Sequence, residues 1–352
     1  MNFLFNEDQT SFQESIGSFL AKECTPESIR ALWETETARS PAMWAKLAEM
    51  GVLGMLAPEE HGGLALSELE LVLPLEEMGR VALVEPVVET AAIAVPLLRD
   101  CSDTELAAEW LPKLAAGEAV ATVGLAINPV VTDAHIADLL LLQHGGEIHA
   151  LTRDDVKLTP QPATDRSRRL FTVDWAPSEA TCIARGDEAV ELLAAAFDRA
   201  ALATAAQLVG IAQQLVDIAV EYAKERQQFG VPIGSFQAVK HHLSTVQVAI
   251  EFARAPVARA ADSVARGLPT RATDVSQAKL MAGEAAVAAA RTALQVHGGI
   301  GYTWEVHLHI WMKRAWALDA AWGSREFHRA RIGRMLFCDL PRLPSFGFDA
   351  EV

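Results

Sequence analysis

The sequence has 352 residues, 51% of them hydrophobic and 22% charged, which is enough chain for two or three globular domains. A net charge of −16 argues against nucleic acid and anionic membranes as partners, and no run of roughly 20 apolar residues provides a membrane span. The four cysteines form no CxxC pair and the first residues do not resemble a signal peptide, so we expect a cytoplasmic protein without a zinc site.

Residues 1–118 are predicted to form an N-terminal helical domain. Ser67 is a good N-cap for one of its helices, and Gly62-Gly63 marks a turn in the loop before that helix. The expected helices are Asp8–Ala21, Pro41–Glu49, about Glu68–Gly79 and about Val88–Leu98.

Residues 119–186 are predicted to form a short middle β domain, because the apolar pattern changes from helical periodicity to alternation. His144-Gly145-Gly146 has the composition of a hairpin turn. The expected strands are AVATVGLAI, ADLLLLQ, EIHALTR and RLFTVDW.

Residues 187–352 are predicted to form a C-terminal helical bundle, which makes the whole chain mainly α with a small β domain. Val190–Arg226 is apolar around most of its circumference and should be buried on several sides. A second helix is expected over Ser235–Arg266, with Pro256 kinking or dividing it, and a third over Thr273–Val296.

The stretch ERQQFGVPIGSFQAVKHH joins the first two of these helices. Gly230 and Pro232 end one helix, and Ser235 is predicted to cap the next. The corner therefore combines a cation (Arg226), free helix N-terminal amides and an amide side chain (Gln237), which are groups suited to a pyrophosphate and a heteroaromatic base. A buried structural turn between two core helices is the alternative interpretation.

A second glycine-rich stretch, ALQVHGGIGYTWE, ends the third long helix. Gly298, Gly299 and Gly301 allow positive φ and close approach of the backbone to a ligand. The stretch does not follow a strand, as a Rossmann GxGxxG motif would, so a nicotinamide dehydrogenase is disfavoured.

The histidines suggest no metal site by their spacing. His307 and His309 are two residues apart, and side chains at that spacing point apart on a helix. His241-His242 is interpreted as a polar helix face.

These two motifs, together with the order helix, W..LAEMGVLGMLAPEEHGGLALS, helix near the N-terminus, resemble the acyl-CoA dehydrogenases. That family uses FAD to desaturate acyl-CoA thioesters, with an electron-transfer flavoprotein as electron acceptor. The resemblance implies that Arg226, Phe229 and Gln237 contact the FAD of a neighbouring subunit. It also implies that Gln295, Gly298 and Gly299 contact the adenosine and pyrophosphate end of FAD.

Glu305 falls where the resemblance suggests a catalytic base that removes the α-proton of the thioester. The alternative is an acid in the first turn of a helix, stabilising the N-terminus of that helix. Some family members carry the base on the preceding long helix, but the matching position here is Ala200. Gly323-Ser324 matches a Gly-Thr pair near the flavin, although Glu326 replaces a glutamine there.

The resemblance covers nearly the whole chain but fails in its middle. The segment AINPVVTDAHIADLL lacks the TEPxxGSD-like and WIT-like motifs that cradle the flavin ring in the family. We therefore expect the short subunit of a heteromer, for example a heterotetramer, with a longer acyl-CoA dehydrogenase partner, as in enzymes of steroid side-chain degradation. Glu305 would then face a degenerate pocket. A self-sufficient homo-oligomer using Glu305 and a flavin-free scaffold of the same fold remain open alternatives.

Overall fold

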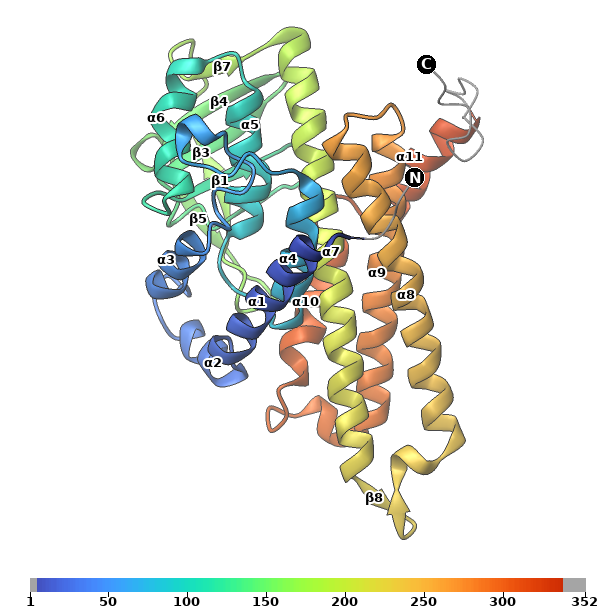
Figure 1. Ribbon diagram of the computed structural model, residues 1–352. Helices are drawn as coiled ribbons and strands as arrows, with labels where there is room; N and C mark the ends of the chain where they lie inside the picture. Colours follow the sequence, from blue (N-terminus) through green and yellow to red (C-terminus); the bar gives the residue numbers. More distant parts are fainter. Residues whose placement is uncertain (1–4, 338–352) are drawn as a thin grey trace.

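The computed structural model describes residues 5–337, so Cys338 and both ends of the chain lie outside the description (Figure 1). The N-terminal part is helical, as predicted, and Ser67 begins its helix with a capping box. Two helices, α2 and α6, were not predicted, because runs of 8 and 12 residues are short for recognising helical periodicity. The helices are α1 (Glu7–Glu23), α2 (Pro26–Trp33), α3 (Pro41–Glu49), α4 (Glu68–Arg80), a π-helical segment (Val88–Ala94) continued by α5 (Val95–Asp100), and α6 (Thr104–Ala115).

The middle part contains two small sheets. All four predicted strands are present, and β2, β5 and β7 are additional. One sheet has the order β1-β3-β4-β7, with β1 parallel to β3, and the other has the order β2-β6-β5. The strands are β1 (Ala121–Gly124), β2 (Val131–Thr132), β3 (Leu139–His144), β4 (Glu147–Thr152), β5 (Lys157–Gln161), β6 (Leu170–Asp174) and β7 (Cys182–Ala184).

The C-terminal part is a bundle around α7, a helix of 40 residues that also packs against the N-terminal helix α4. Figure 1 shows α7, α8 and α9 side by side, with the small β8–β9 hairpin at the end they share. Pro256 lies inside α8 without dividing it, so of the two expected effects, a kink or a division, division is excluded. The elements are α7 (Gly186–Glu225), β8 (Gln227–Gln228), β9 (Val231–Pro232), α8 (Gln237–Ala265), α9 (Arg271–His297), α10 (Leu308–Ala320) and α11 (Arg325–Phe337).

The helix α7 is long and apolar enough to cross a membrane by length and composition alone. Its most apolar window is 83% buried inside the protein, however, which is the behaviour of a core helix. The apolar circumference of α7 is therefore explained by the helices packed around it.

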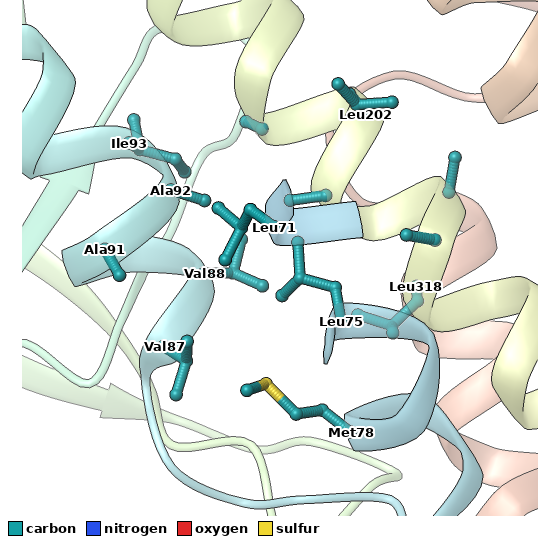
Figure 2. Close-up of a cluster of buried hydrophobic side chains, with 14 of the residues drawn as sticks. Leu71, Leu75, Met78, Val87, Val88, Ala91, Ala92, Ile93, Leu202 and Leu318 are labelled. Atoms are coloured by element: carbon teal, nitrogen blue, oxygen red, sulfur yellow. The ribbon is translucent and has the colours of Figure 1, made fainter. Parts of the chain in front are cut away.

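One core joins the N-terminal helices to the bundle. Figure 2 shows Leu71, Leu75 and Met78 of α4 packed with the π-helical segment and with Leu202 of α7. The backbones of α4 and α7 touch where they cross: a Cβ added at Gly210 would lie 1.8 Å from the Glu76 carbonyl oxygen. This close crossing holds the segment after α4 against the bundle. Two acidic residues of that segment, Glu85 and Glu89, are positioned in this way.

Candidate cofactor-binding site

The predicted cofactor corner is a tight β-hairpin at the end of α7. Arg226 leaves the helix in an extended conformation while its backbone N–H still donates to the Tyr222 carbonyl oxygen (2.9 Å). Phe229 and Gly230 form the two-residue turn, both with positive φ (55° and 82°). Positive φ is uncommon for a phenylalanine, and the side chain is 92% exposed, so this turn presents an aromatic ring to the outside.

The prediction that Ser235 caps α8 is wrong. The Ser235 hydroxyl donates to the Pro232 carbonyl oxygen (2.7 Å) within a 3₁₀ turn, and the helix begins at Gln237. Phe236 occupies the cap position and has no acceptor in its side chain. Within the described chain the first amides of α8 therefore have no side-chain cap, and they remain available to an acceptor from outside.

The structure brings the two predicted motifs to the same end of the bundle. The Tyr222 ring of α7 stacks on the His297 ring of α9, with centroids 4.2 Å apart and an interplanar angle of 16°. Arg226, Gln237 and Gln295 are all exposed here. Within residues 5–337 none of these three side chains makes an ion pair or hydrogen bond, so each is free to contact another molecule.

The paired glycines expose their backbone at this end. Gly298 has φ 63° and ψ −139°, a conformation that side chains with a Cβ rarely adopt. An added Cβ at Gly298 or Gly299 would meet nothing within 4 Å, whereas one at Gly301 would lie 2.9 Å from Leu294 Cδ1. Gly301 is thus required by internal packing, and Gly298 and Gly299 leave open backbone facing outward.

Glu305 lies on the surface between a 3₁₀ turn, Gly298–Tyr302, and α10. Its backbone N–H donates to Thr303 Oγ1 (3.3 Å), and its carboxylate is exposed. The alternative of a first-turn acid is wrong, because α10 starts only at Leu308. Its assignment as a catalytic base stays a prediction.

The second possible location of a base, on α7, is occupied by structural ion pairs. Asp198 is buried and bonded to Arg271 (2.8 Å) and Arg331 (2.7 Å). Arg199 beside it pairs with Glu68 (2.8 Å), and Ala200 has no functional group. These carboxylates are therefore engaged in holding α4, α9 and α11 to α7.

A small polar cavity of about 40 Å³ lies between the segment after α4, the turn around β2, and α10. Arg39 pairs with Asp133, both nearly inaccessible to solvent. Arg314 pairs with Asp165 and donates to the Leu83 carbonyl oxygen (2.8 Å). The charged side chains lining the cavity are Arg39, Glu85, Glu89, Asp133, Arg168 and Arg314.

Burial changes the ionisation of these groups. It raises the pKa of Glu85 to about 7 and also raises the pKa of Glu89, while it lowers the pKa of the Arg168 guanidinium. Sequence reasoning missed both acids. The signal was present, since Glu85 and Glu89 interrupt the otherwise apolar stretch LVEPVVETAAIA.

A larger cavity of about 460 Å³ lies among α1, α2 and α3 and shares the Leu83–Glu85 wall with the polar one. Its size falls in the range of small-molecule sites. Glu85 Oε1 accepts a hydrogen bond from the Ser40 backbone N–H (3.0 Å) at its edge. Burial raises the pKa of Cys24 to about 12, so this thiol stays un-ionised and is no nucleophile. The cavity is otherwise lined mainly by Phe19, Ile29, Leu32, Met43, Leu83 and Val84.

Comparison with known proteins gives one consistent family. Residues 190–337 match the acyl-CoA dehydrogenase C-terminal domain, and residues 6–118 match the acyl-CoA dehydrogenase N-terminal domain. The acyl-CoA dehydrogenase IpdE2 of Mycolicibacterium smegmatis is 34% identical over 313 residues, covering 88% of this chain and 93% of that protein.

Two solved structures share the fold over nearly the full length. The ChsE4-ChsE5 complex from Mycobacterium tuberculosis contains a chain with a TM-score of 0.86 and 26% identity, covering 97% of this chain and 100% of that one. The steroid acyl-CoA dehydrogenase Tcur3481-Tcur3483 gives a TM-score of 0.85 and 25% identity, covering 94% and 98%.

Proposed function

The chain belongs to the acyl-CoA dehydrogenase family of oxidoreductases, and from that premise we propose that it is the short subunit of a heteromer that binds FAD between two different chains. The reaction is the α,β-desaturation of a CoA thioester, for which bound FAD supplies the hydride acceptor. In this proposal the present chain holds the adenosine and pyrophosphate end of the cofactor, and a longer partner holds the flavin ring.

The exposed corner supports the first half of the proposal. A pyrophosphate needs cationic and N–H donors, and the corner offers the unpaired Arg226 guanidinium beside the uncapped amides of α8. Gln237 and Gln295 add amide groups, and the open backbone at Gly298-Gly299 permits close approach. All of these groups face outward, so a cofactor bound here must extend beyond this chain.

The polar cavity supports the second half, and this observation carries the proposal. In the family, the segment matching AINPVVTDAHIADLL cradles the flavin ring, and here that segment carries Asp133, which pairs with Arg39. The remaining space of about 40 Å³ is room for a few waters. Sites for small molecules span roughly 300–1,000 Å³, so a tricyclic ring does not fit beside these ion pairs.

An exposed apolar surface supports the presence of a partner chain. Val248 and Phe252 are four residues apart on one face of α8 and are 54% and 67% exposed. Phe229 and Tyr302 extend the apolar exposure at the cofactor end. Large exposed apolar side chains on one helix face, such as Val248 and Phe252, are typical of an interface.

The relatives indicate the substrate class. The ChsE4-ChsE5 neighbour is a complex of two named chains, and Tcur3481-Tcur3483 is described as a steroid enzyme. We extend both features to this chain, and propose an acyl-CoA whose acyl group carries a steroid, with an electron-transfer flavoprotein as the acceptor by family resemblance.

The test measures flavin per chain by absorption. The chain is purified alone and after co-expression with a longer acyl-CoA dehydrogenase chain of the same organism. We expect little flavin in the first preparation and about one FAD per pair of chains in the second. A fully loaded homo-oligomer would refute the heteromer, and absence of flavin with every longer partner would favour the scaffold.

A further inference from the structure

Three side chains with metal-binding atoms lie together at the tip of the β3–β4 hairpin, remote in sequence from the cofactor corner. The strand register pairs His144 with Glu147 across the turn Gly145-Gly146. His149 follows Glu147 by two residues and therefore faces the same side of the sheet. The ligand atoms of His144, Glu147 and His149 all lie within 4.8 Å of one another.

The His149 ring is held in one orientation by a chain of hydrogen bonds. Its side chain is 1% exposed, and its Nδ1 lies 3.0 Å from Thr181 Oγ1. The Thr181 hydroxyl donates its own hydrogen to the Ser178 carbonyl oxygen (3.1 Å). While the Thr181 hydroxyl donates to this carbonyl oxygen, its Oγ1 accepts from the ring, and the neutral ring then carries its hydrogen on Nδ1; when the hydroxyl donates to Nδ1 instead, the hydrogen of the neutral ring is on Nε2.

The tautomer with its hydrogen on Nδ1 leaves a bare lone pair on His149 Nε2, which is buried and without a hydrogen-bond partner among the described residues. The atom that it faces is another acceptor, Glu147 Oε2, at 3.4 Å. Two acceptors in contact repel unless a cation lies between them. The contact is relieved by a proton on Nε2, in the neutral or the charged ring, or by a metal ion.

The spacing suits a metal ion. Zinc bonds of about 2.0–2.2 Å in a tetrahedron place neighbouring ligand atoms about 3.3–3.6 Å apart, a range that includes the 3.4 Å between His149 Nε2 and Glu147 Oε2. Trp175 packs against both imidazoles, with centroids 5.0 and 6.0 Å away, and so shelters one side of the cluster. A buried imidazole oriented by a second hydrogen bond is typical of a metal ligand.

We propose that His144, Glu147 and His149 bind one divalent transition-metal ion, with Zn²⁺ as the expected occupant. Imidazole nitrogen favours zinc over magnesium or calcium, and two histidines with one carboxylate leave a fourth position for water. The ion joins the end of β3 to the start of β4 at the tip of the hairpin, and this site is independent of the flavin site.

The test is zinc titration of the untagged full chain by calorimetry, with Co²⁺ absorption as a spectroscopic check on nitrogen ligands. We expect one ion per chain. His144→Ala changes an exposed side chain and Glu147→Gln keeps the shape, so both variants should fold, and each should weaken zinc binding by at least about tenfold. His61→Ala, which removes a partly exposed imidazole outside the hairpin, should bind as the parent does.

Two results would overturn the proposal. One is the absence of stoichiometric zinc binding, with nitrogen NMR showing a proton on His149 Nε2, the nitrogen that faces Glu147. The other is stoichiometric binding that neither His144→Ala nor Glu147→Gln weakens, which would place the ion elsewhere. Flavin content is expected to be unchanged in both variants, so failure of the heteromer proposal would leave this test unaffected.

Discussion

Replacing Arg226 by alanine is expected to weaken FAD binding without altering the fold. The Arg226 guanidinium is exposed and makes no hydrogen bond or ion pair within the described chain, so its removal costs the free protein no polar interaction. The end of α7 depends instead on the backbone N–H of residue 226, which alanine retains. The effect of the substitution should therefore appear only in the complex with cofactor.

The size of the loss follows from the kind of contact. A hydrogen bond to a charged group contributes about 1.5–3 kcal/mol, and a planar guanidinium can make two such bonds to a phosphate. Because about 1.4 kcal/mol corresponds to a tenfold change, one such bond predicts a loss of affinity of about ten- to a hundredfold. The exposed position makes the effect dependent on ionic strength.

Lys224→Ala is the matched control. Lys224 lies on the last turn of α7, near the same corner, but its ammonium is already paired with Glu221 (2.6 Å) on the surface. The Lys224→Ala substitution removes one positive charge, as Arg226→Ala does, but leaves the proposed phosphate contact of Arg226 in place. We expect its FAD affinity to stay within about twofold of the parent, since exposed ion pairs contribute little.

The assay is FAD titration of the deflavinated heteromer by flavin fluorescence, with circular dichroism as the check on helical content. Unchanged affinity in Arg226→Ala would show that the corner is structural. An equal loss of FAD affinity in Lys224→Ala would also refute the reasoning, because the change in net charge alone would then explain the effect.

The remaining predictions concern three other regions. If the ring side of this chain is degenerate, Glu305→Gln should leave single-turnover flavin bleaching by acyl-CoA nearly unchanged in the assembled heteromer; a loss of ~10²–10⁴-fold would instead make Glu305 the base. Burial raises the pKa of Glu85 from 4.5 to about 7, so the folded state favours the protonated acid and loses stability as pH rises across that interval, by about 3 kcal/mol. Urea unfolding at several pH values should show a flatter profile for Glu85→Gln, and an unchanged profile would contradict the assignment. Gly210→Ala should destabilise the fold by at least about 1–3 kcal/mol, because the added Cβ would overlap the Glu76 carbonyl oxygen. Gly267→Ala is the control: it has positive φ but open space around it, so it should destabilise the fold less. Equal melting temperatures for these two variants would contradict the close crossing of α4 and α7.

The sequence alone was sufficient for the arrangement of helical, β and helical parts along the chain and for the family resemblance. Long periodic stretches such as Val190–Arg226 predicted α7 well, because helical periodicity depends on neighbours three or four residues away. The candidate residues Arg226, Gln237 and Gln295 were identified from two short motifs and from the family resemblance that these motifs carry. The start of α8 was predicted less accurately. The Ser235 hydroxyl donates to the Pro232 carbonyl oxygen within a turn, and Phe236 is the N-cap residue.

Only the tertiary structure decided how these local pieces meet. Tyr222 and His297 are 75 residues apart, and their stacking brings the two motifs to one end of the bundle. Arg39 and Asp133 are 94 residues apart, yet they form a buried ion pair that lines the polar cavity. Burial and charge pairing depend on which distant segments pack together. For this reason the raised pKa of Glu85 could not be predicted from the sequence.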